Sequence, residues 1–194
     1  SQAKSEKMES DQEEKRSSQA DQLVALVTDE NCELFHDQFK EPYAHILVEN
    51  HWENHKIKNK QFSQWLSRLL WKKTGKAANP TALQSALAVI KGKACFEGRL
   101  YHLDTRVVQR DDVIWYDLGN DQWQAVKITS EGWEIVDNPP ILFCRYSHQK
   151  PQVLPVPASI EDIKRVETFL NLAKSEYNLL LLVYLVSCFI PDIA

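Results

Sequence analysis

The chain of 194 residues carries 23 Lys and Arg against 27 Asp and Glu, and 43% of its residues are hydrophobic. This length and apolar content suit one domain with a core, or slightly more than one. The four cysteines are widely scattered without a C-x-x-C pair, which disfavours a disulfide scaffold and predicts reduced thiols in a cytoplasmic protein.

The first part of the chain is polar. Residues 1–20 form a mixed-charge tract with almost no apolar side chains, so we expect disorder or a tether there. Residues 21–28 read DQLVALVT and predict a short helix that docks on the rest of the protein. We predict an α+β domain over 21–157 and a C-terminal helical segment over 158–194 that leads towards a following domain.

Strand-forming residues and histidines share the next region. Residues 34–35 and 43–48 are apolar and β-prone, and a turn at 40–42 separates them. The histidines of 51–55 lie near further candidate zinc ligands, namely Cys32, His36 and His45. Their spacing fits no standard zinc finger and is not the H-E-x-x-H pattern of metalloproteases. We therefore predict no metal site, with the histidines on the surface or satisfied in the core.

One stretch, residues 54–96, concentrates positive charge. It contains no Asp or Glu and nine basic residues: Lys56, Lys58, Lys60, Arg68, Lys72, Lys73, Lys76, Lys91 and Lys93. The rest of the chain has 14 basic residues against 27 acidic ones. Such asymmetry in a mildly acidic protein favours a polyanionic partner, usually nucleic acid. The alternative is a solvated, lysine-rich surface without a partner.

Residues 60–74 have the pattern of an amphipathic helix. Apolar side chains recur at helical spacing and form one stripe: Phe62, Trp65, Leu66, Leu69 and Leu70. Gln64, Arg68 and Lys72 are four apart and form a polar row on another face. Trp71 lies nine residues after Phe62, which at about 100° per residue places it opposite the stripe. Its ring is either free to stack on a base or covered by another element.

A second helix follows at once. Gly75 ends the first helix, and Asn79 with Pro80 has the pattern of an N-cap and a first helical residue. The predicted buried face consists of Leu83, Leu87, Ile90 and Ala94. A helical hairpin followed by strands suggests a helix-turn-helix or winged-helix arrangement. Because it has few base-reading side chains, we expect its contacts to be mainly with phosphates.

The region from 99 to 146 predicts an antiparallel β meander. Short β-branched and aromatic runs at 100–109, 112–118, 122–129, 132–136 and 141–146 are separated by turn residues. Its tryptophans, Trp115, Trp123 and Trp133, are interpreted as core. The acidic residues are Asp104, Asp111, Asp112, Asp117 and Asp121, and most of them lie at or beside turns. No Asp-x-Asp pair occurs on a strand, so we predict no catalytic residue, metal or cofactor.

Two helices close the chain. Residues 150–157 form a proline-rich, extended connector. Ser159 and Asp162 make a capping box that opens a helix to about residue 173, and 176–189 predicts another helix. The apolar run at 179–190 has 12 residues, whereas a bilayer span needs about 20. We expect a buried or interfacial helix and no membrane anchor. The predicted fold is therefore α+β: a meander, a helical hairpin and two C-terminal helices.

Several short motifs follow one another along the chain: Phe62-x-x-Trp65-Leu66, Tyr116-Asp117-Leu118, Ala125-Val126-Lys127-Ile128, Gly132-Trp133-Glu134-Ile135-Val136, Pro140, Phe143, Arg145 and Leu154-Pro155-Val156-Pro157. Their order resembles the domain that precedes the P-loop ATPase in phage- and plasmid-type primase-helicase proteins. The resemblance covers about residues 34–190 and implies an ATPase domain after the last helix. The chain lacks a G-x-x-x-x-G-K-[ST] loop, so the resemblance implies a role beside a motor, and it supplies no catalytic residue.

The leading hypothesis is a non-catalytic, DNA-binding accessory domain of a DNA-replication ATPase of a mobile element. The expected nucleic-acid-binding residues are Lys58, Lys60, Arg68, Trp71, Lys72, Lys73 and Lys76. The apolar C-terminal helix would dock on the following ATPase domain or on neighbouring subunits. A protein–protein adaptor or oligomerisation domain is the alternative, because charge also steers protein association. A third hypothesis is a metal-dependent nuclease or primase that uses the aspartates or the histidines.

Overall fold

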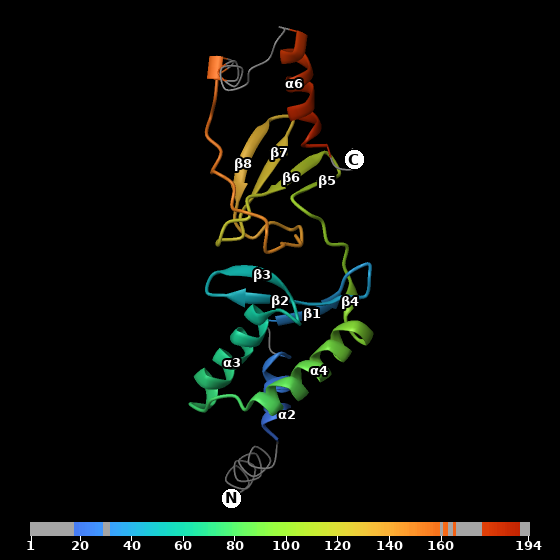
Figure 1. Cartoon of the computed structure of the whole chain (residues 1–194), viewed down its shortest axis with the longest axis vertical. Coiled ribbons are helices and arrows are strands. Elements are labelled where there is room, and N and C mark those ends of the chain that lie inside the picture. The colour runs from blue at the N-terminus through green and yellow to red at the C-terminus, as the bar shows by residue number, and fades with distance from the viewer. Residues whose placement is uncertain (1–17, 29–31, 160, 163–164, 166–175, 191–194) are drawn as a thin grey trace, which may run out of the picture. The chain divides into compact units, whose positions relative to one another are not determined.

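The computed structural model describes residues 18–28, 32–159, 161–162, 165 and 176–190. The chain forms two compact units, divided between Leu103 and Asp104 (Figure 1). This boundary falls inside the range 21–157 that the sequence analysis treats as one domain.

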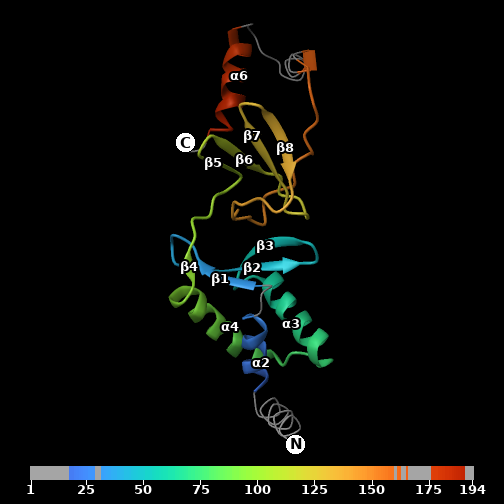
Figure 2. The ribbon, with the colours of Figure 1, turned by 180° about the vertical axis from the view of Figure 1, so that it is seen from behind.

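The first unit is a four-stranded sheet with helices on one face (Figures 1 and 2). Its elements are α2 (Gln19–Leu26), β1 (Cys32–His36), β2 (Pro42–Val48), β3 (His51–Lys56), α3 (Lys60–Thr74), α4 (Pro80–Phe96) and β4 (Arg99–Leu100). The strand order is β3-β2-β1-β4, with β1, β2 and β3 antiparallel and β4 parallel to β1. Helix α2 packs against both α3 and α4.

The core of the first unit lies between the sheet and these helices. The strands contribute Ala44 and Ile46, and the helices contribute fully buried side chains at helical spacing: Leu23, Phe62, Leu66, Leu70, Ala86, Ile90 and Ala94. The predicted docking helix is confirmed, since α2 packs against α3 and α4 and buries Leu23 in the core. Ser18 caps this helix in a capping box with Asp21. The remainder of the predicted polar tract, residues 1–17, lies outside the described residues.

Strand β3 was not predicted from the sequence. His51, Glu53 and His55 pair with Val48, Ile46 and Ala44 of β2, and therefore point to the same face as the core of the sheet. Because these core-facing positions carry polar side chains, β3 lacks the apolar alternation of a half-buried strand.

The predicted helical hairpin is followed by strands, as expected, but its surroundings differ from an isolated helix-turn-helix. Three of the four strands precede α3 and α4, and only the two-residue β4 follows them in this sheet. In addition, α2 packs against both helices, so that they are members of a three-helix layer.

The second unit contains the predicted antiparallel meander. Its strands are β5 (Val107–Arg110), β6 (Val113–Asp117), β7 (Ala125–Thr129) and β8 (Gly132–Val136), in the order β5-β6-β7-β8. Two of the five runs predicted as strands do not form the strands expected of them. The run 100–109 is divided between β4 in the first unit and β5 in the second, and the run 141–146 makes only an isolated bridge between Asp104 and Phe143.

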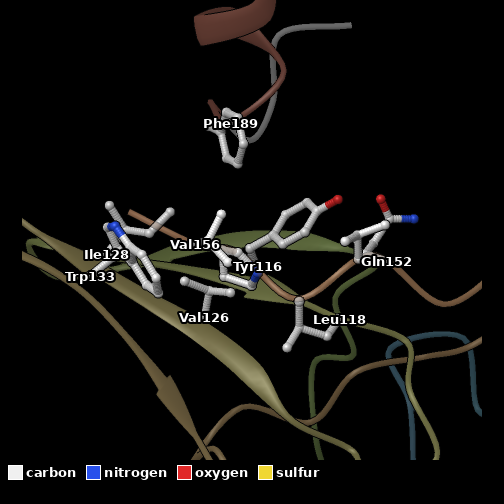
Figure 3. A pocket seen from close by; sticks show the side chains of 10 residues that line it. Tyr116, Leu118, Val126, Ile128, Trp133, Gln152, Val156 and Phe189 are labelled. Carbon is white, nitrogen blue, oxygen red and sulfur yellow. The ribbon is translucent and has the colours of Figure 1, made fainter. Parts of the chain in front are cut away.

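Both faces of the meander are apolar. One face forms a core from Val108, Trp115 and Ala125, which Phe143 covers. The other face carries Tyr116, Val126 and Ile128, which line a groove together with residues of the segment 152–156 (Figure 3).

The C-terminal helix α6 (Glu176–Ser187) ends two residues before its predicted end. Beyond its end, Phe189 packs against Tyr116, with ring centroids 5.5 Å apart. The capping box of Ser159 and Asp162 is present, whereas most of the predicted helix that it opens lies outside the described residues. None of the helices in the described ranges combines the length and the apolar content that a membrane span requires.

Candidate functional site

Helix α3 carries most of the residues predicted to bind nucleic acid. Phe62, Leu66 and Leu70 recur every four residues and are buried against the sheet and α2, so the opposite side of the helix faces solvent. The helix ends at Gly75, whose left-handed conformation (φ 66°) lets its N–H donate to the Trp71 carbonyl. The prediction of an amphipathic helix over 60–74 with a glycine stop is confirmed.

The structure places all the predicted binding residues on the surface: Lys58, Lys60, Arg68, Trp71, Lys72, Lys73 and Lys76. Among the described residues, no acidic side chain forms an ion pair with Lys60, Arg68, Lys72, Lys73 or Lys76. We call these five residues, together with Trp71, the α3 basic surface.

Lys58 differs from the other predicted cations. Its ammonium group lies 2.9 Å from a carboxylate oxygen of Glu41, which precedes β2. A phosphate at Lys58 would compete with this carboxylate, so Lys58 is a weaker candidate than the five cations of the α3 basic surface.

In the folded protein, some lysines of the acid-free stretch 54–96 contact glutamates from outside that stretch. Besides the pair of Lys58 with Glu41, Lys93 on α4 lies 3.5 Å from Glu97, just outside the stretch. Lys56 sits over the Tyr43 ring, 5.5 Å from its centroid. The fold therefore leaves its unpaired positive charge mainly on α3 and the turn that follows.

Polar side chains form a row along α3, and three of its four positions carry a cation. Lys60, Gln64, Arg68 and Lys72 are four residues apart, so each lies about 40° around the helix from the one before. The row from Lys60 to Lys72 is about 18 Å long at 1.5 Å per residue. Lys73 and Lys76 extend the positive charge around the C-terminal end of the helix. A charged chain such as a phosphate backbone could lie along this row.

Trp71 is 59% exposed and lies on the solvent side of α3. The alternative that another element covers it does not hold within the described part of the chain. Trp65, by contrast, packs against the core beside Phe62, with ring centroids 5.6 Å apart.

The histidines of β2 and β3 make hydrogen bonds instead of a common metal site. Nδ1 of His45 lies 2.7 Å from Oδ1 of Asn54, and burial lowers the pKa of His45, which favours a neutral ring that donates to Asn54. His51 and His55 each contact one carboxylate oxygen of Glu53. Burial alone would raise the pKa of Glu53, but the hydrogen bonds from both histidines outweigh it and lower the pKa.

The aspartates of the second unit do not lie together as a common metal or catalytic site would require. Asp117 is buried and accepts hydrogen bonds from two nitrogens of Arg145, at 2.5 and 3.0 Å. Asp104 pairs with Arg110 at 2.8 Å, and Asp111, Asp112 and Asp121 are exposed. Among the described residues, no group of three or more His, Cys, Asp or Glu side chains is arranged to hold a metal ion. This arrangement gives no support to a nuclease or primase centre.

All four cysteines are free thiols. Burial, with a smaller contribution from Glu33, raises the pKa of Cys32 to about 12, so this thiol stays protonated and unreactive at neutral pH.

The groove on the second face of the meander was not predicted from the sequence. Its volume is about 380 Å³, and its wall includes Tyr116, Trp133 and Phe189 (Figure 3). The sequence contains a signal for a second apolar face, because β6 and β7 have apolar residues at consecutive positions and not only at alternate ones. Trp133, interpreted as core, is instead 43% exposed at this groove.

Comparisons with protein-family models, with curated proteins and with solved structures gave no match, so the function is inferred from the residues of this chain.

Proposed function

We propose that the first unit is a non-catalytic nucleic-acid-binding module whose α3 basic surface lies against a phosphate backbone. The observation that carries this proposal is the row of exposed cations on α3, none paired with an acidic side chain among the described residues. The resemblance of the sequence motifs further suggests an accessory domain of a DNA-replication ATPase of the primase-helicase type, from a mobile element.

The electrostatics favour such a local contact. The whole chain carries a formal net charge of −4, which repels a polyanion at long range. Positive charge concentrated on one helix therefore determines the orientation in which a nucleic acid can approach. Phosphate contacts of this kind fix orientation and contribute affinity, but they do not read sequence.

A salt titration of oligonucleotide binding tests this proposal. If all five cations of the surface contact phosphates, log Kd changes with log salt by about 0.7 to 0.9 per contact. Between 50 and 200 mM salt, affinity then falls roughly 100- to 500-fold. The triple variant R68Q/K72Q/K73Q keeps two of the contacts and loses only about 7- to 12-fold over the same range.

The matched control removes the same charge from the second unit, in the triple variant R110Q/K127Q/K150Q. It is expected to keep the salt dependence of the wild type, because its cations lie outside the α3 basic surface. Absence of binding at 50 mM salt, binding that ignores salt, or equal losses in both triple variants would each refute the proposal.

A protein–protein adaptor is the second candidate function, and α6 is the observation that favours it. Among its residues, Leu179, Leu180, Val183, Tyr184 and Val186 are each more than half exposed, and 177–190 contains no charged residue. Such a helix suits contact with another protein surface, for example a neighbouring subunit or the ATPase domain that the resemblance implies. An excess of free oligonucleotide should displace a partner bound at α3 but not one bound at α6.

A further inference from the structure

The surroundings of Trp71 are unusually open for a tryptophan on a helix. On an α-helix, the side chains three and four residues away are the neighbours that cover a given ring. For Trp71, the residues at i−4, i+3 and i+4 are Ser67, Thr74 and Gly75, all small.

The hydroxyl groups of two of these residues bind backbone carbonyls of the helix. The hydroxyl of Ser67 donates to the Ser63 carbonyl, and that of Thr74 to the Leu70 carbonyl, each at 2.8 Å. A Cβ atom built at Gly75 would meet nothing within 4 Å. With respect to the described part of the chain, the indole therefore keeps most of its surface free. Arg68 at i−3 is the one long side chain among its i±3 and i±4 neighbours on the helix.

From this arrangement we infer that Trp71 is a stacking platform for an unpaired nucleobase, so that the α3 basic surface binds single-stranded nucleic acid in preference to duplex. This inference rests on the proposed function and adds the form of the ligand. In a duplex, each base face is already stacked on its neighbours, and the indole could reach a base face only at an end. In a single strand, a base can turn onto the indole while its phosphates meet Arg68 and Lys72.

The size of the surface agrees with a single strand. The row from Lys60 to Lys72 is about 18 Å long, which suits a short site of a few nucleotides. Single-strand binding sites of OB folds, for comparison, span about 4 to 16 nucleotides. One aromatic platform within such a row gives little sequence preference, since every base has a face that can stack.

The experiment compares three labelled probes of equal length: a single-stranded DNA, its duplex, and a single strand in which every nucleotide is abasic. The variants are W71A, W71F and the control W133A, which removes a comparably exposed tryptophan from the second unit. Binding is measured by fluorescence anisotropy at 50 mM salt.

The wild type should bind the single strand more tightly than the duplex or the abasic strand. W71A should lose about 5- to 150-fold in affinity for the single strand, the loss typical of one stacked base. Its affinity for the abasic strand and its salt dependence should stay unchanged, W71F should retain most of the binding, and W133A should behave as the wild type.

Equal binding of single strand and duplex, or a W71A variant that binds the single strand as the wild type does, would overturn the inference. If binding nevertheless weakens in R68Q/K72Q/K73Q, the proposed function survives without the stacking platform. If no probe binds, both fail.

Discussion

The ion pair between Asp117 and Arg145 should stabilise the second unit more than any other charged contact described there. Asp117 is 2% exposed, and its carboxylate accepts two hydrogen bonds from Arg145 and one from the Gly119 N–H at 3.0 Å. The guanidinium also donates to the Asn120 carbonyl at 2.6 Å and stacks over the Trp123 ring, 3.9 Å from its centroid.

The substitution Asp117→Ala would leave the Arg145 guanidinium in a nearly buried site without its counter-ion. Removing one partner of a buried pair typically costs about 3 to 5 kcal/mol. For a unit of about 90 residues, 1 kcal/mol lowers Tm by about 4 to 8 °C, so the variant should melt at least 12 °C lower or fail to fold the second unit.

Two comparisons test whether the unpaired charge of Arg145 causes the loss of stability. Replacing both partners, in D117L/R145M, should cost less than Asp117→Ala, because no unpaired charge remains in the buried site. The control Arg110→Gln breaks the exposed pair with Asp104 and should cost less than about 1 kcal/mol.

Hydrogen exchange measured by mass spectrometry over a urea series suits this protein, because peptides from β6 and α3 report on the two units separately. Asp117→Ala should shift the β6 transition and leave the α3 transition in place. If Asp117→Ala costs no more than Arg110→Gln, or if the double variant is the less stable one, the reasoning about the buried charge is refuted.

Two further predictions concern the first unit. A Cβ added at Gly98 would clash with the backbone carbonyl of Ala94 and lie 2.9 Å from that of Leu34, so Gly98→Ala should lower the urea midpoint of the α3 transition. The control Gly92→Ala, where α4 has open space, should raise stability by about 0.5 to 1 kcal/mol, and equal effects of both substitutions would refute the steric reason. Because hydrogen bonds from two histidines lower the pKa of Glu53 below its usual 4.5, the associated stability is present above about pH 4.5 and is lost as pH falls through the lowered pKa. In a series of unfolding measurements from pH 6 to pH 3, Glu53→Gln should be less stable than the wild type at pH 6 and should lose less stability on acidification; parallel curves would contradict this.

The sequence was sufficient for the features that depend on neighbouring residues. The period of Phe62, Leu66 and Leu70 predicts which side of α3 is buried, and hence that Trp71 and Arg68 are exposed. Caps are equally local: the Asn79 side chain accepts from the Thr81 N–H at 2.8 Å, as expected for the start of α4. The meander was predictable because its turns and β-prone runs alternate within a few residues.

Other features depend on how the chain folds beyond a single segment. Strand β3 carries polar side chains and becomes recognisable as a strand only through its pairing with the preceding strand β2. The run 100–109 divides because its two ends join different sheets. The pairing of Asp117 with Arg145, 28 residues away, turns a candidate metal ligand into a partner of a buried guanidinium.

The amino-acid sequence by itself determined the helices, their caps and the local excess of lysine, since these follow from the spacing of side chains along one segment. Only the tertiary structure decided which cations stay unpaired, because Glu41 reaches Lys58 through the folding of β2 against β3, while the solvent side of α3 receives no such neighbour among the described residues.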